Sequence, residues 1–198
     1  MLLEKDKSII RELAKKYMDL ALSEKQLEMN KRMQATNDLK LVRPVVLMDE
    51  IPWYQMNIDG ELDLCCEDPR LHGLEHYFRT SLYRRKYFKC DTILDPVFKV
   101  RKAYDSSGIG IDSNKESSAE QIKGDFVYAR KPNPANVAIK TDPEVIRIET
   151  EKTVKACQKH GCPLEFVLKD ISTVSGKPEN LIVWAKTVSD VLDYYYGK

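Results

Sequence analysis

The sequence lacks the features of a membrane protein, a secreted protein or a charge-driven nucleic-acid binder. Its 198 residues contain no run near the ~20 apolar residues that a membrane-spanning helix requires. Lysines and arginines number 32 against 31 acidic residues, and the net charge of +1 creates no broad field for nucleic acid or an anionic membrane. Charges occur too early at the N-terminus for a signal peptide. We therefore expect a cytoplasmic protein that binds neither nucleic acid nor membrane.

Cysteine is also scarce, and its arrangement excludes a disulfide-stabilised scaffold. The five cysteines are an odd number without a Cys-x-x-Cys pair, and Cys65 and Cys66 are adjacent. This pattern favours a reducing compartment. What the chain does contain is 42% hydrophobic residues, which is enough for the core of one ordinary domain.

Helical periodicity occupies the N-terminal part of the chain. Apolar residues recur at helical spacing over the first 21 positions. Ser23 followed by Gln26 resembles a capping box, which predicts that a second helix begins there. We expect residues 1–40 to form a helical arm and residues 41–198 to form a single main domain.

Short apolar runs alternate with amphipathic segments through the main domain. The runs predict strands at 45–48, 92–94, 126–129 and 164–168. Helices are predicted to begin after the capping pairs Asp68-Pro69, Asp142-Pro143 and Lys177-Pro178. Between these elements we expect a hairpin at 98–111, a linker-like junction at 113–120 and a loop at 130–136. Repeated strand–helix order predicts an α/β fold with a parallel sheet.

Functional groups in such folds gather at the carboxyl ends of the strands. The candidates selected by this rule are Asp49, Glu50, Asp95, Arg130, Lys131, Lys169, Asp170 and Ser172. Lys169 could bind an anionic group or act as a base, Asp170 could accept a proton or bind a metal, and Ser172 could orient a substrate. A structural interpretation stays open, in which Asp170 and Ser172 cap a turn and Lys169 pairs with a carboxylate.

The other candidates also have two interpretations. Asp49, a candidate catalytic group, could converge with Glu50 and Asp95 to raise one another's pKa or bind a cation, or these groups could pair with basic neighbours. Arg130, Lys131 and Asn133 could contact an anionic substrate, but Asn133 could instead form a local turn. Trp53 could line a pocket or belong to the core.

Two blocks of the sequence resemble the uroporphyrinogen decarboxylase superfamily. The more specific block runs from Phe126 to the end and includes Arg130-Lys131-Pro132-Asn133-Pro134 and Leu164-Glu165-Phe166-Val167-Leu168-Lys169-Asp170. The other block includes Arg43-Pro44-Val45-Val46-Leu47-Met48-Asp49-Glu50 and Asp91-Thr92-Ile93-Leu94-Asp95. The superfamily has a (β/α)8 TIM-type barrel and includes decarboxylases, which are lyases, and corrinoid-dependent methyltransferases.

The resemblance implies a partial barrel, because a full one typically needs ~250 residues. The predicted strands are equivalent to barrel strands 1, 2, 7 and 8, with the junction at 113–120 where the middle is missing. They could adjoin in the order 7-8-1-2. Two open edges would remain, which a homodimer or a complementing chain could cover.

The resemblance implies a decarboxylase-like or methyl-transfer reaction on a small or tetrapyrrole-like ligand, with corrinoid or zinc as possible cofactors. Family decarboxylases hold acidic side chains with arginines after the first strand, where this chain has Asp49 and Glu50. Zinc-dependent members place a cysteine after the last strand, where this chain has Lys169 to Ser172. The alternative is a non-catalytic, shortened paralogue that acts as a binding or assembly module.

Two short motifs resemble zinc ligands. His72-Gly73-Leu74-Glu75-His76 matches the inverted zinc-protease pattern, although a partly packed helix face is the simpler interpretation. His160-Gly161-Cys162 has a His-x-Cys spacing, but a helix C-cap accounts for it equally well. We therefore predict no metal ligands.

Overall fold

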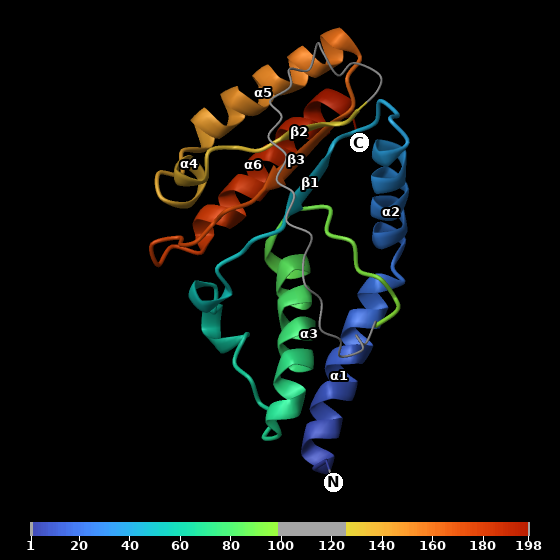
Figure 1. Cartoon of the computed structure of the whole chain (residues 1–198), viewed down its shortest axis with the longest axis vertical. Helices are drawn as coiled ribbons and strands as arrows, with labels where there is room; N and C mark the ends of the chain where they lie inside the picture. Colours follow the sequence, from blue (N-terminus) through green and yellow to red (C-terminus); the bar gives the residue numbers. More distant parts are fainter. Residues whose placement is uncertain (1, 99–125, 198) are drawn as a thin grey trace, which may run out of the picture.

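The computed structural model describes residues 2–98 and 126–197 (Figure 1). Within these residues, a small sheet packs with the three C-terminal helices, and the other three α-helices are N-terminal. The hairpin predicted after Phe98 and the junction at 113–120 lie outside the described residues.

The sheet has three parallel strands, β1 (Val45–Met48), β2 (Tyr128–Arg130) and β3 (Leu164–Leu168), in the order β1-β3-β2. Val46 lies opposite Phe166, and Ala129 lies opposite Glu165. The predicted parallel α/β class is therefore confirmed. As expected, the strand predicted at 164–168 lies between the strands predicted at 45–48 and 126–129.

The strand predicted at 92–94 is absent, and the reason lies in the residue before it. The Asp91 backbone N–H donates to the Val46 carbonyl oxygen at 2.8 Å, as a neighbouring strand would. The Val46 N–H, however, donates to the Asp91 carboxylate at 2.9 Å. A side chain thus takes the acceptor position of a strand carbonyl, and the ladder ends after one backbone bond.

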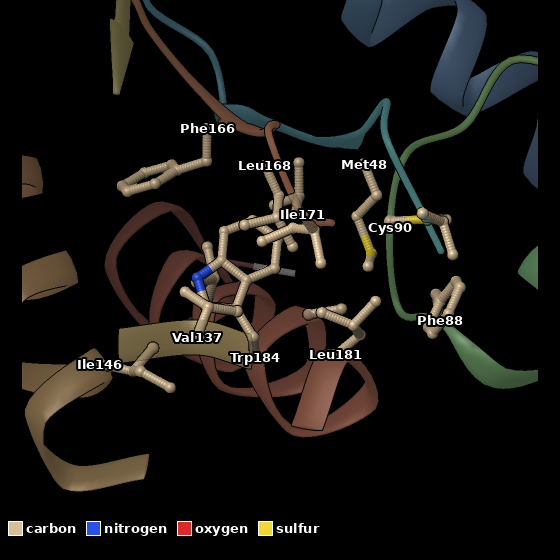
Figure 2. Close-up of a cluster of buried hydrophobic side chains, with 14 of the residues drawn as sticks. Met48, Phe88, Cys90, Val137, Ile146, Phe166, Leu168, Ile171, Leu181 and Trp184 are labelled. Atoms are coloured by element: carbon tan, nitrogen blue, oxygen red, sulfur yellow. The ribbon is translucent and has the colours of Figure 1, made fainter. Parts of the chain in front are cut away.

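Two long helices cover one face of the sheet and pack against each other, α5 (Pro143–His160) and α6 (Glu179–Tyr196). Trp184 of α6 is 1% exposed. Figure 2 shows its indole among Val137, Leu168 and Ile171. Burying such a large aromatic side chain is a major contribution to the stability of this layer.

Local capping signals account for most of the helix limits. The Asp142 carboxylate accepts hydrogen bonds from the N–H groups of Glu144 and Val145 at the start of α5. Gly161 ends α5 with φ 62°, in the left-handed region that favours glycine. The predicted loop at 130–136 was wrong in part, because a short helix α4 (Pro134–Ala138) begins after Asn133.

The three N-terminal helices are α1 (Glu4–Ala21), α2 (Glu24–Asn37) and α3 (Pro69–Tyr87). All three were predicted from their periodicity and caps. Two short 3-10 segments, η1 (Trp53–Gln55) and η2 (Ile58–Gly60), lie in the connection from β1 to α3. Figure 1 shows α1 and α3 side by side and extending away from the sheet, with a separate small core around Tyr17 and Phe78. In this position α3 does not cover the sheet as a barrel helix would.

Candidate functional site

The loops that follow β1 and β3 lie against each other at the carboxyl edge of the sheet. The Glu50 carboxylate accepts the Asp170 N–H at 2.8 Å. The Tyr54 hydroxyl donates to the Ser172 carbonyl oxygen at 2.7 Å. The Gln55 side-chain oxygen accepts the Val174 N–H at 2.7 Å. Most of the strand-end candidates are thus brought together as the parallel topology predicts.

Opposite charges pair across these loops. The Lys169 Nζ lies 3.8 Å from an Asp49 carboxylate oxygen, and Lys131 pairs with Asp170. These four side chains are between 46% and 57% exposed, so water screens each pair. Asp170 has φ 60°, a left-handed conformation that aspartate tolerates in turns. The arrangement matches the structural interpretation, in which Lys169 pairs with a carboxylate.

A half-buried carboxylate, Glu165, lies on the same strand and was not among the predicted site residues. Leu164, Phe166 and Leu168 of β3 point into the core, so Glu165 and Val167 belong to the opposite face. Burial, followed by the negative charge of Asp49, raises the pKa of Glu165. The two-residue period that links it to Lys169 is the sequence signal that would have identified it.

Three further candidates have structural partners. The Asn133 side chain accepts the Ala135 N–H at 3.0 Å and so caps α4. Arg130 Nη2 lies 3.9 Å from the Glu149 carboxylate, beside a cavity of about 320 Å³ between β2 and α5. Trp53 is half-buried, with its ring edge-on to Tyr83 at a centroid distance of 5.9 Å. The Arg84 guanidinium lies 5.3 Å from the Trp53 ring centroid, a cation–π contact.

Asp95 occupies a different part of the molecule from Asp49 and Glu50. Its carbonyl oxygen accepts the Tyr17 hydroxyl of α1 at 2.9 Å, and its carboxylate accepts the Val97 N–H at 3.1 Å. Figure 1 shows this segment running from the end of α3 to α1, away from the loop after β1. The missing fourth strand explains the separation, since Asp95 no longer ends a neighbouring strand.

The histidine motif on α3 is held in structural contacts. Glu75 is fully buried and accepts the N–H groups of Cys65 and Cys66 at 2.8 and 2.9 Å. Arg79 also binds it through Nε at 2.8 Å. His72 Nε2 lies 2.9 Å from the Cys66 carbonyl oxygen. Within residues 2–98 and 126–197, no group of three potential metal ligands occurs.

The second zinc-like motif completes the C-terminal cap of α5. The Cys162 N–H donates to the Cys157 carbonyl oxygen at 2.9 Å, the hydrogen bond of a Schellman motif. Both thiols are buried, and burial raises their pKa, that of Cys157 to about 12. Protonated, enclosed thiols are poor metal ligands and poor nucleophiles.

Sequence reasoning missed a buried ion network at the opposite end of β1. Asp91 pairs with Arg32 of α2 and with Arg43, which in turn binds Asp193 of α6 through Nε at 2.7 Å. The Asp91 side chain is 4% exposed. These residues are far apart in the sequence, and no local sequence pattern predicts that they are in contact.

Comparisons with known proteins yield no relatives: no protein-family model, no curated protein and no solved structure matches this chain. In the part of the chain that the structure describes, no helix is both long enough and apolar enough to span a membrane.

Proposed function

We propose that this chain is a shortened relative of the uroporphyrinogen decarboxylase superfamily that acts as a binding and assembly module. One observation carries the proposal: the strand-end groups expected to act on a substrate bind one another. Lys169 pairs with Asp49, Lys131 pairs with Asp170, and Glu50 holds the Asp170 backbone. These contacts hold the two loops together and occupy the side chains that would otherwise bind a substrate. The open edge of the sheet is then the feature that calls for a partner.

The outer edge of β2 is the surface that we assign to assembly. In a parallel pair, alternate residues direct their backbone groups to opposite sides. Tyr128 donates its N–H toward β3, so the N–H and C=O of Ala129 face outward. No strand among the described residues pairs with this side. Exposed edges of this kind are normally covered or paired.

A second copy of the chain fits this edge. A two-fold axis at Ala129 would pair β2 with itself in antiparallel orientation, with Arg130 opposite the aromatic Tyr128 of the second copy. The exposed Ala129 side chain offers no steric barrier near the axis. The result would be one continuous six-stranded sheet. A complementing chain that supplies the absent barrel strands is the other partner consistent with the family resemblance.

A catalytic role is the second candidate, favoured by the charges on the face opposite α5 and α6. Glu165 lies on β3, Asp49 and Lys169 directly follow the adjacent strands β1 and β3, and Glu165 has a raised pKa. A carboxyl group of this kind can hold a proton for transfer. The reaction would be a decarboxylation or a corrinoid-linked methyl transfer.

Ligand titrations separate the two roles. The full chain is titrated with a corrinoid, a porphyrin and Zn²⁺, while absorption spectra and bound metal are measured. Stoichiometric binding with shifted absorption bands, lost in Lys169→Met, would support the enzyme. Unchanged spectra together with a stable oligomer would support the module.

A further inference from the structure

A cavity of about 330 Å³ lies beside the start of β1, between α2, the segment 88–91 and α6. Its volume is at the lower end of the range for small-molecule sites, roughly 300–1,000 Å³. Met29, Phe88 and Cys90 form an apolar part of its wall. The cavity is at the opposite end of β1 from the strand-end loops, and it includes the buried ion network.

On the inner wall of the cavity, every carboxylate oxygen of Asp91 and Asp193 already accepts a hydrogen bond. One Asp91 oxygen binds Arg32, and the other accepts Arg43 Nη1 at 3.1 Å and the Val46 N–H at 2.9 Å. One Asp193 oxygen accepts Arg43 Nε at 2.7 Å, and the other accepts Lys89 Nζ at 2.7 Å. Each oxygen of these two carboxylates therefore already has a basic partner.

The basic side chains, by contrast, have N–H groups that donate to no acceptor among the described residues. Arg32 engages its acceptors within the described residues through Nη1 alone, and Arg43 leaves its Nη2 without one. A guanidinium carries five N–H donors, so several remain on these two side chains. Lys25 at the rim likewise has no acceptor among residues 2–98 and 126–197. The wall thus has an excess of donors.

These donors are placed where they would bind an anion well. The Arg32 and Arg43 side chains are 24% and 11% exposed, so solvent competes weakly for them. Charge-assisted hydrogen bonds strengthen as water is excluded. Lys25, Arg32, Arg43 and Lys89 outnumber Glu28, Asp91 and Asp193 in the lining.

We propose that this cavity binds a small organic oxyanion, a molecule with one phosphate or carboxylate group and a compact apolar part. The oxyanion would accept from Arg32, Arg43 and Lys25, because guanidinium groups match both phosphate and carboxylate oxygens. The apolar part would lie against Met29 and Phe88. This site is independent of the assembly proposed for the β2 edge.

Calorimetric titration of the full chain tests the proposal with three probes: phenyl phosphate, benzoate and inorganic phosphate. Phenyl phosphate or benzoate should bind with a dissociation constant below about 1 mM, at least ~10-fold more tightly than inorganic phosphate. The tighter of the two organic probes identifies the preferred oxyanion. The proposal would be overturned if neither organic probe binds at about 10 mM, or if inorganic phosphate binds as tightly as the organic probes.

Charge variants on α2 test the position of the site. Lys25 and Glu28 line the cavity but lie outside the buried ion network, whereas Arg32 belongs to it. Lys25→Gln should weaken binding about threefold, and Glu28→Gln should strengthen it by a similar factor. Lys31→Gln is the matched control, because Lys31 is exposed on the same helix and does not line the cavity. Arg32→Lys keeps a cation beside Asp91 but removes the guanidinium fork, and should weaken binding of the probe about tenfold. Equal affinity in Lys25→Gln, Glu28→Gln and Lys31→Gln would place the ligand elsewhere and overturn the assignment.

Discussion

At the scale of single residues, the clearest case is a carboxylate that the fold keeps ionised although it is buried. Desolvation alone would raise the pKa of Glu75. Hydrogen bonds from the Cys65 and Cys66 backbone and from Arg79 outweigh it and lower the pKa to about 2. Glu75 therefore ties the loop before α3 to the helix itself, and its place in a zinc-like motif is incidental.

Replacing Glu75 should be costly. Glu75→Gln breaks the buried pair with Arg79 and should lower the free energy of unfolding by about 3 kcal/mol. Because the folded pKa is depressed, the stabilisation is complete above pH 4.5 and is lost as the pH falls toward 2. Urea unfolding between pH 7 and pH 3 measures both effects, with the exposed Glu67→Gln as control. Similar stability of the two variants at pH 7 would contradict this role.

Glu165 should behave in the opposite way. Its raised pKa means that the folded state disfavours the charged form, so this group costs stability as the pH rises above 4.5. Glu165→Gln should therefore unfold at a higher temperature than the parent chain at pH 7, and the difference should shrink below pH 4.5. Thermal unfolding at pH 7 and at a pH below 4.5 measures this difference, with the more exposed Glu149→Gln as control. A destabilised Glu165→Gln at pH 7 would indicate a hydrogen-bonding role instead.

At the scale of elements, helices and strands with local signals could be predicted from the sequence. The caps at Asp68 and Asp142 and the left-handed Gly161 define α3 and α5. The apolar runs at β1 and β3 were also identified at their observed limits. The strand at 92–94 could not be rejected, because its failure depends on a hydrogen bond between the Asp91 side chain and a distant strand.

The candidate site shows the same division between local and distant information. Strand-end position correctly grouped Asp49, Glu50, Lys169 and Asp170, since topology alone brings those residues together. It misplaced Asp95, whose position depended on the absent strand. The buried ion network was invisible, because its members come from α2, the approach to β1, the segment after α3 and α6.

Asp91 joins these separate elements, so its replacement should loosen them together. Asp91→Asn can still accept the Val46 N–H but leaves Arg32 and Arg43 without their shared carboxylate. We expect a loss of about 3 kcal/mol in the free energy of unfolding. Urea unfolding measures it, with the exposed Asp38→Asn at the end of α2 as control. A loss below about 1 kcal/mol, typical of a surface pair, would show that the network is unimportant.

At the scale of the whole molecule, the described sheet is too small to close on itself. Helices α5 and α6 cover one face, Asp91 occupies the outer side of β1 at Val46, and β2 presents its outer edge. A three-residue strand at an edge gains little stability alone, and pairing with a second copy would double the width of the sheet. We therefore expect the open edge of β2 to be paired in solution.

The most direct test is the molar mass of the full chain in solution, measured by light scattering over a wide concentration range. We predict a dimer, twice the mass of the chain, that dissociates at low concentration. Ala129→Pro, which removes the outward N–H of β2, should shift the equilibrium to folded monomer, whereas Ala156→Ser on the neighbouring helix should not. A parent chain that remains a folded monomer at every concentration would contradict the account.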